Sequence, residues 1–349
     1  MKTFLFVCMC ALQISAQNLR PIRDDVGFCW QANEMDSLIS WLDKNPLNNT
    51  KYSQDGLVAA ISPHDDYLFA GKVYAPLYKL IKTKEVVIFG VTHGAVRKEI
   101  NDPQNVIMLD DFNQWKGAYG NVTVSPLREK IKKELPQQYQ MVNEKAQTLE
   151  HSIEALIPFI QHYNKDIKIT PIMVTMMPFE RMDSLSLMLS DIISNYIKAN
   201  NLTIGKDIFF LISNDADHYG EDFKNSPYGL DDKAHLKAIE TDMLFAHNHF
   251  DGEINREKIV GVTTILWPEA SRNKVVPNWC GRYPIVLGLL TVTKIVHGLM
   301  GKSLEGKVLA YSDSWTNGVI PLKGTHMGIT APFSLKHWVG YLSAGFWFK

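Results

Sequence analysis

Two apolar stretches decide the fold, and each ends in a histidine: Val58-Ala59-Ala60-Ile61-Ser62-Pro63-His64 and Val86-Val87-Ile88-Phe89-Gly90-Val91-Thr92-His93. Short, continuous apolar runs of this kind predict strands that are buried on both faces of a sheet. A third such run, Ile208 to Ser213, leads into Asn214-Asp215-Ala216-Asp217-His218. The sequence therefore predicts three buried strands whose carboxyl ends carry His or Asp.

Segments with helical spacing of apolar residues alternate with these runs. We expect helices over residues 67–82, 152–163, 181–199, 233–247 and 283–299, and further strands over residues 167–175 and 307–312. This alternation predicts an α/β fold of three layers, a mostly parallel central sheet with helices on both faces. Residues 101–125 lack the alternation, and we expect an irregular excursion or a hairpin there. We expect a single domain over residues 17–349.

The first 16 residues have the three-part pattern of a secretory signal peptide. A short basic start (Met1-Lys2-Thr3) precedes the apolar segment Phe4–Leu12, and Ile14-Ser15-Ala16 suits cleavage after Ala16. We therefore expect an exported protein, periplasmic or secreted. The alternative is a buried N-terminal helix.

The most apolar later segment is Pro284–Met300, which contains Lys294 and His297. These two polar residues favour a core helix over a membrane span, so we expect no stable membrane insertion.

The overall composition is that of an ordinary globular protein. The chain has 349 residues, a formal net charge of −1 and 46% hydrophobic residues. This balance argues against nucleic acid as a partner, because nucleic-acid binding favours a strongly basic face. Loss of the signal peptide would leave only Cys29 and Cys280 in an oxidising compartment. Two cysteines provide one disulfide, or two thiols with separate roles.

The strand-end positions of His64 and His93 suggest a binding site. Open α/β sheets bind ligands just beyond the carboxyl ends of their strands, and neutral imidazole is a common metal ligand. If the two strands are neighbours, both rings can point into one crevice. The alternative is that each is a hydrogen-bonded loop histidine.

The polar group Asp215, Asp217 and His218 follows the third strand. A carboxylate and an imidazole there would bind metal or serve as a general base. Alternatively, one of the acids caps a following turn.

Cys280 precedes an apolar helix. The helix dipole and Arg282 would stabilise its thiolate as a ligand or nucleophile. The alternative is a buried, inert thiol.

The run Glu150-His151-Ser152-Ile153-Glu154 is expected to open a helix, with Ser152 in its capping region. His151 and Glu154 would then face the site or be solvated residues of the first turn.

Five motifs in order resemble the Memo family, also called AmmeMemoRadiSam system protein B, which is related in fold to the LigB-type class III extradiol dioxygenases. Pro63-His64-Asp65-Asp66-Tyr67 corresponds to the family's Pro-His-Ala-Gly-Tyr, and Gly90-Val91-Thr92-His93 to Gly-Pro-Ser-His. Residues 150–154 match unchanged. Residues 213–220 resemble Ser-Ser-Asp-x-x-His-Trp-Gly, and residues 280–285 resemble Cys-Gly-x-x-Pro-Ile.

The resemblance implies a metal site formed by His64, His93 and Cys280. Asp215 and His218 would handle protons as catalytic residues. Further residues would surround the pocket: Asp65, Asp66, Glu150, His151, Asp217 and Cys29. The implied cofactor is one transition-metal ion, iron or copper, with zinc as the alternative. The implied activity is redox or dioxygenase-like chemistry on a small substrate. The alternatives are a non-catalytic protein that binds a small molecule or peptide, and a metal-assisted hydrolase.

Two departures from the family pattern bear on this chemistry. Asp65 and Asp66 replace Ala-Gly, and two carboxylates there would favour a harder metal or a site of two histidines and one carboxylate. The alternative is that both acids face solvent. Cys29 is also unusual, and one hypothesis places it near Cys280, where the two would form a disulfide or both bind metal.

Overall fold

The centre of the molecule is a set of five parallel strands in the order β6-β8-β3-β9-β2. The computed structural model describes residues 18–267 and 277–349. The strand bounds are β2 Leu57–Ser62, β3 Glu85–Val91, β6 Val122–Val124, β8 Lys168–Val174 and β9 Ile208–Ser213. The strands predicted from the apolar runs are therefore confirmed. The signal peptide predicted for residues 1–16 lies outside the described residues and stays a prediction.

Further strands extend the sheet at both edges, and most of them are antiparallel to their neighbours, although β1 is parallel to β5 and β4 to β7. Beyond β2 lie β13 (His337–Phe348), β12 (Leu304–Asp313) and β11 (Gly252–Ile254), and β10 (Asp215–Gly220) pairs with β13. Beyond β6 lie β5 (Gln114–Trp115) and β1 (Leu19–Arg20), while β4 (Ile107–Leu109) pairs with β8 and with β7 (Gln140–Val142). The antiparallel pair β5 and β6 is the hairpin expected within residues 101–125. The sequence analysis did not predict β10 or β13.

Alternate residues of the central strands enter two separate apolar cores. The first core contains Val87, Phe89, Phe210 and Ile212. The second contains Val86, Ile88, Phe209 and Leu211. Because successive side chains of a strand point to opposite faces, both faces of the sheet must be covered.

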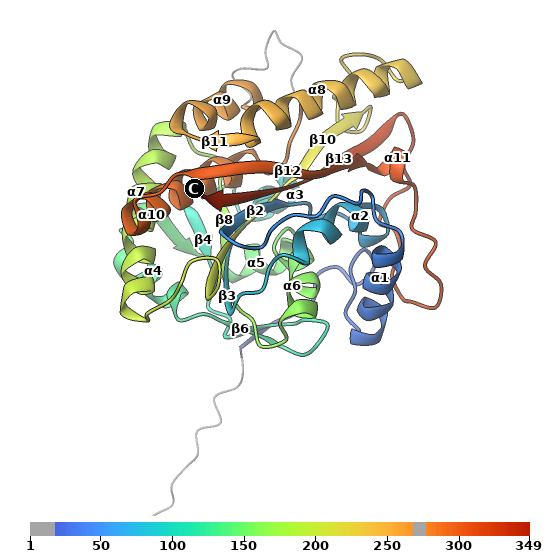
Figure 1. Cartoon of the computed structure of the whole chain (residues 1–349). Helices are drawn as coiled ribbons and strands as arrows, with labels where there is room; N and C mark the ends of the chain where they lie inside the picture. The colour runs from blue at the N-terminus through green and yellow to red at the C-terminus, as the bar shows by residue number, and fades with distance from the viewer. Residues whose placement is uncertain (1–17, 268–276) are drawn as a thin grey trace, which may run out of the picture.

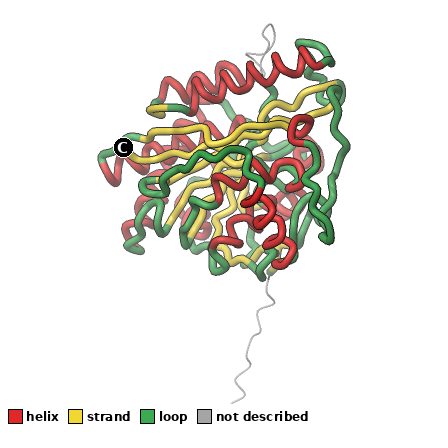
Figure 2. Tube along the Cα trace, turned by 45° about the vertical axis from the view of Figure 1, so that its right-hand side comes forward, coloured by secondary structure: helices red, strands yellow, loops and turns green. Residues whose placement is uncertain are grey.

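Helices cover the two faces of the sheet, so the predicted three-layer α/β architecture is confirmed (Figures 1 and 2). The layer over the first core comprises α4 Leu127–Glu134, α7 Phe179–Ala199, α8 Asp232–Phe250, α9 Arg256–Leu266 and α10 Arg282–Met300. The layer over the second comprises α1 Ala32–Lys44, α2 Tyr67–Tyr78 and α6 Ile157–Tyr163. The shorter helices are α3 Gly94–Glu99, α5 Glu144–Leu149, α11 Ser314–Asn317, η1 Gln137–Tyr139 and η2 Glu154–Leu156.

The position of β9 determines how the strand ends meet. His64 and His93 were expected to share a crevice if β2 and β3 were neighbours. Instead, β9 lies between these two strands and pairs in parallel with both. His64 and His93 therefore follow strands that flank β9. The end of β9, at Ser213, comes between the two histidine-bearing segments.

Helix α10 is the one helix of the described residues that is long and apolar enough to cross a membrane by length and composition. It packs against α7, α9 and the strands β3, β8 and β9. Eleven of its residues are buried, from Pro284 to Val296. The core helix predicted for this segment is confirmed.

Close packing of α10 on the sheet depends on Gly288. A Cβ atom at Gly288 would lie 2.7 Å from Ile212 Cδ1, closer than side chains normally approach. Gly298 lies on the same helix, and a Cβ there would have no heavy atom within 4 Å. These two glycines form a matched pair for testing the packing.

We expect Gly288→Ala to lower the free energy of unfolding by about 1–3 kcal/mol through overpacking. Gly298→Ala should instead raise it by up to about 1 kcal/mol, since alanine favours the helix. Urea unfolding followed by circular dichroism measures both changes. Equal effects of the two substitutions would contradict the packing described here.

Candidate metal centre

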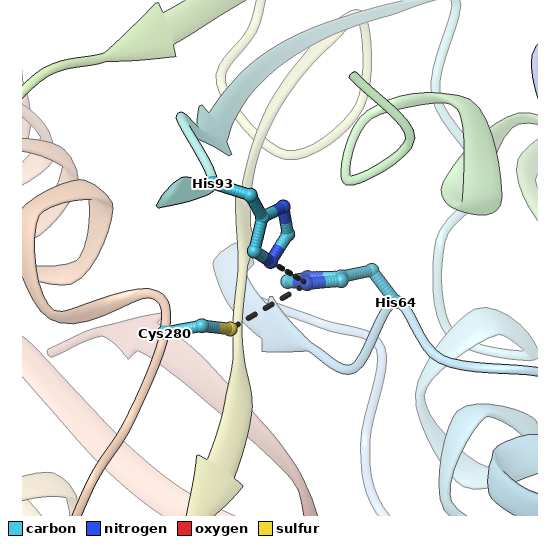
Figure 3. Close-up of side chains that lie close together, drawn as sticks. All are labelled: His64, His93 and Cys280. Carbon is cyan, nitrogen blue, oxygen red and sulfur yellow. Dashed lines mark hydrogen bonds between the residues drawn. The ribbon is translucent and has the colours of Figure 1, made fainter. Parts of the chain in front are cut away.

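The side chains of His64, His93 and Cys280 lie close together (Figure 3). His64 follows β2, His93 follows β3 and Cys280 precedes α10. His64 Nε2 lies 3.3 Å from His93 Nε2 and 3.5 Å from Cys280 Sγ. The three ligand atoms all lie within 4.8 Å of one another. The structure thus brings together the three residues that the resemblance implied.

The protonation of His64 follows from its partner at the end of β9. Ser213 Oγ lies 2.6 Å from the carbonyl oxygen of Ser152 and must donate its only proton to it. Ser213 Oγ also lies 2.8 Å from His64 Nδ1, which must therefore be the donor in that bond. His64 Nε2 then keeps an unprotonated lone pair that faces His93 and Cys280.

Glu150 fixes the orientation of His93. Its Oε1 lies 2.8 Å from His93 Nδ1, and its Oε2 accepts the His93 backbone N–H at 2.9 Å. Oε1 also accepts the backbone N–H groups of His151 and Ser152. Burial alone would raise the pKa of Glu150, but the His93 charge and these bonds bring it below its usual value. Glu150 is therefore ionised and holds His93 Nδ1–H, which leaves Nε2 for a ligand.

The pKa values of the two histidines shift in opposite directions. Burial lowers the pKa of His64 far below its usual value, and the charges of His93 and His151 lower it further. Burial also acts to lower the pKa of His93, but the Glu150 carboxylate outweighs it and the net shift is upward. His64 is therefore neutral near pH 7.

The segment that carries Cys280 runs beside the start of β10. The Cys280 backbone N–H donates to the Asp215 carbonyl, and the Asp215 backbone N–H donates to Cys280 Sγ at 3.2 Å. Asn214 Oδ1 accepts the Gly281 N–H at 2.9 Å. A Cβ atom at Gly281 would lie 2.5 Å from the Asn214 Cβ, so only glycine allows this close approach.

Asp217 supports that segment from behind. Asp217 Oδ1 accepts the Asn278 N–H at 2.6 Å and an Asn225 side-chain N–H at 2.8 Å. Asp242 accepts from the Trp279 indole N–H and from the Tyr311 hydroxyl. Asp217, which was predicted to lie in the pocket or to support its residues, anchors the Cys280 segment. The turn cap considered for these acids is wrong, because they lie in strand β10.

Burial outweighs Arg282 in setting the pKa of the Cys280 thiol, which favours the protonated form until a metal ion displaces the proton. Burial raises its pKa well above the usual value, and the nearby Asp215 raises it further. Arg282 donates to the Trp279 and Leu266 carbonyls and to Asn278 Oδ1. The charge of Arg282 lowers the pKa of Cys280, but by less than burial raises it.

Asp215, His218 and Cys280 form a second candidate metal-binding group that shares the thiol with the first. Asp215 Oδ1 accepts the His64 backbone N–H, and its Oδ2 lies 3.2 Å from His64 Nε2. Burial raises the pKa of Asp215 well above its usual value, and the nearby Asp65 adds to the shift. Burial lowers the pKa of His218 to about 4, so its ring is neutral near pH 7.

A third group of potential ligands, His93, Glu150 and His151, is also close together. The His151 ring stacks on the His93 ring, with centroids 4.7 Å apart and planes 4° apart. Because Glu150 already accepts four N–H groups, it is better suited to orient His93 than to bind a metal.

A pocket of about 260 Å³ opens onto the site from the side of His93, His218 and Cys280. Its other lining residues are Val91, Thr92, Gly94, Arg97, Val174, Met176, Asn278, Arg282, Tyr283 and Pro284. His64 is buried and does not line the pocket. The pocket is large enough for a small ligand next to the candidate metal centre.

The two acids that depart from the family pattern do not face solvent freely. Asp66 is buried and its Oδ2 accepts the backbone N–H and the hydroxyl of Thr330. Burial raises the pKa of Asp66 to about 7, and Asp65 adds to the shift. Asp65 Oδ2 accepts the Tyr341 hydroxyl at 3.0 Å. Neither acid belongs to a candidate ligand group among the described residues, so their contacts indicate a role in packing.

The hypothesis of a disulfide between Cys29 and Cys280 is wrong in this structure, because both cysteines are free. The buried Cys29 thiol points to the Gln31 carbonyl, 3.4 Å away. Cys29 belongs to none of the candidate metal-binding groups.

The capping role expected for Ser152 is also wrong. Its hydroxyl accepts the Val91 N–H at the end of β3, and the helical segment begins at Glu154. Glu154 is buried and pairs with Arg20, so it is neither solvated nor part of the site.

Several contributors to the site were missed by the sequence analysis. Ser213 was identified as the end of a predicted strand and the first residue of a motif but was given no role, and Asp242 lay within a predicted helix. Arg97 and Met176 line the pocket but belong to none of the motifs. The polarity of Ser213 after five consecutive apolar residues was a signal that would have singled it out.

Comparison with known proteins agrees with the motifs. The sequence model of a family described as "Memo-like protein" matches residues 28–319. A MEMO1 family protein of Aquifex aeolicus is 31% identical over 164 residues, which cover 46% of this chain and 54% of that protein. One from Saccharolobus islandicus is 29% identical over 198 residues, covering 54% of this chain and 61% of that protein. The chain thus spans little more than half the length of these relatives.

The hydrogen bonds predict one tautomer for His64. In the metal-free protein near pH 7, we expect a proton on Nδ1 and none on Nε2, because Ser213 Oγ can only accept from the ring. Long-range ¹H–¹⁵N correlation spectra of the histidine rings distinguish the tautomers, and His64→Gln assigns the signal. A proton on Nε2 in place of Nδ1 would contradict the arrangement.

Proposed function

The chain belongs to the Memo-like protein family, and we propose that it binds one transition-metal ion, iron or copper, through His64, His93 and Cys280 for redox chemistry on a small substrate. The observation that supports this proposal most directly is the convergence of two imidazole nitrogens and one sulfur from three separate segments. Imidazole and thiolate together suit iron, copper and zinc far better than magnesium or calcium.

The distances between the ligand atoms fit a metal ion. At the bond lengths of a zinc site, two nitrogens with a tetrahedral angle between them lie about 3.3–3.4 Å apart, and a nitrogen and a sulfur about 3.5–3.6 Å apart. The observed separations are 3.3 Å from His64 Nε2 to His93 Nε2 and 3.5 Å from His64 Nε2 to Cys280 Sγ. The ligand atoms therefore need little rearrangement to share one ion.

The unfavourable contacts of the bare residues also point to a cation. His64 Nε2 carries a lone pair, and a neutral His93 would present a second lone pair to it at 3.3 Å. A proton on His93 relieves this repulsion, and so would a bound cation. Cys280 and Asp215 would release their protons on metal binding, since both bind metals in their ionised forms.

Residues around the site hold the ligands in place. Ser213 and Glu150 each bind the Nδ1–H of one histidine, which directs the opposite nitrogen toward the centre. Such outer hydrogen bonds commonly contribute about 10–100-fold to metal affinity. A redox-active ion held there would supply electron transfer and open coordination positions.

His218 is placed to exchange a proton with a substrate. Its Nδ1 lies 3.0 Å from the Ala216 carbonyl and must donate to it. The lone pair of the neutral ring is then on Nε2, and the residue lines the pocket beside Cys280. The neutral ring would accept a proton or hydrogen bond from a substrate hydroxyl, with Asp215 nearby as the second titratable group.

We expect His64→Ala and His93→Ala each to remove stoichiometric metal from the protein and to abolish oxygen uptake, because each deletes one of three ligands. Metal content is measured by mass spectrometry on untagged protein, and oxygen uptake with catechols or thiols as trial substrates. His247→Ala is the matched control, since His247 is exposed and pairs with Asp251 far from these residues in the sequence.

The two readouts separate the parts of the proposal. Retained stoichiometric metal in both variants would refute the ligand assignment. Zinc as the bound metal with no oxygen uptake would overturn the redox assignment and favour hydrolysis. If the wild-type protein is purified without metal and also fails to take up added iron, copper or zinc, the remaining candidate is a non-catalytic binding function.

A further inference from the structure

The pocket next to the candidate metal centre has a positive lining. Arg97 and Arg282 both contribute to it, and no Asp or Glu is among its lining residues within the described chain. The two histidines that line it cannot supply negative charge. A pocket with two guanidinium groups and no carboxylate favours an anionic ligand.

Arg282 has donor capacity left for such a ligand. Its three nitrogens donate to the Trp279 carbonyl, the Leu266 carbonyl and Asn278 Oδ1, at 2.7, 2.9 and 2.6 Å. All of these acceptors are neutral, and in residues 18–267 and 277–349 no carboxylate forms an ion pair with Arg282. A guanidinium has five N–H groups, so within the described residues these three bonds leave two N–H groups for a ligand. The three bonds also fix the plane of the group.

Arg97 contributes a second guanidinium that is poorly neutralised. Its nearest acidic partner is Asp102, whose Oδ1 lies 3.6 Å from Arg97 Nη1 and whose side chain is 48% exposed. Arg97 Nη1 also contacts Met176 Sδ, a weak acceptor. The Arg97 Nε–H is buried and has no hydrogen-bond partner in the described part of the chain. A buried N–H without an acceptor is costly, and a ligand oxygen would satisfy it.

Arg97 and Arg282 line the same pocket. An anion placed between the two guanidinium groups would offset their like charges.

We propose that this pocket binds the carboxylate of a small organic acid between Arg97 and Arg282, with the rest of the molecule directed toward His93, His218 and Cys280. A carboxylate matches the planar fork of a guanidinium, which binds it through two parallel hydrogen bonds. The volume of about 260 Å³ limits the ligand to a small molecule.

The remaining walls of the pocket suit a short apolar body. Val91, Val174, Met176 and Pro284 contribute apolar surface to the pocket. That this acid is the substrate rests on the proposed metal-dependent function. The binding of the carboxylate itself does not, because neither arginine is a proposed metal ligand.

The test compares acids with neutral molecules of the same shape. Isothermal titration calorimetry on the full-length protein would use acetate, succinate and benzoate, each paired with its amide, and inorganic phosphate as a separate anion. We expect at least one carboxylate to bind at least tenfold more tightly than its amide. Arg97→Gln should weaken that binding at least tenfold, and Arg282→Lys should weaken it as well, because lysine lacks the fork.

Arg256→Gln is the matched control. Arg256 is 65% exposed, pairs with Asp183 and does not line the pocket, so carboxylate binding should be unchanged. Circular dichroism identifies a variant that has failed to fold, and Arg97→Lys then serves in its place. The proposal is overturned if no carboxylate exceeds its amide, if Arg97→Gln binds like the wild type, or if only phosphate binds.

Titrations with and without added metal separate this inference from the proposed function. If binding requires metal and ignores Arg97, the carboxylate binds the ion and not the arginines, which overturns the inference. If the protein binds no metal but shows Arg97-dependent carboxylate binding, the inference stands and the proposed function fails.

Discussion

The hydrogen bonds of the Ser213 hydroxyl hold the candidate site together. This group ends β9, accepts from His64 after β2 and donates to Ser152, the residue whose hydroxyl bonds to the end of β3. One buried hydroxyl therefore ties three neighbouring strand ends together and sets the tautomer of His64. Leaving such buried groups without partners would cost about 1–3 kcal/mol each. The parallel order β3-β9-β2 makes this arrangement possible, because it places the end of β9 between the two histidine-bearing segments.

The parts of the fold that could be predicted are those with strong periodic signals. The runs before His64 and His93 are apolar on both faces and gave buried parallel strands. Strand β13 was missed because glycines, serine and aromatics interrupt its pattern, and its burial arises from partners distant in sequence. Strand β10 was missed for a related reason: Asp215, Asp217 and His218 look like a turn, but pairing with β13 holds them extended.

The location of the site was easier to predict than the roles of its residues. His64, His93 and Cys280 were identified through motif order, and the structure brings them together. Cys29 was expected near Cys280 but belongs to none of the candidate metal-binding groups, because nothing in the sequence states which way a side chain points. Burial outweighs Arg282 and favours the protonated form of Cys280, so the thiolate would form when a metal ion binds. Arg97 was not considered, since its place in the pocket depends on how α3 follows β3.

The central claim is that two imidazoles and the Cys280 thiolate share one metal ion, and X-ray absorption spectroscopy of the metal-loaded protein tests it most directly. In the zinc-loaded wild type, we predict one sulfur at about 2.3 Å and nitrogen or oxygen ligands at about 2.0–2.1 Å. Cys280→Ser should lose the sulfur contribution, whereas Cys29→Ser should keep it. A wild-type spectrum without sulfur, or a sulfur signal that persists in Cys280→Ser, would contradict the account.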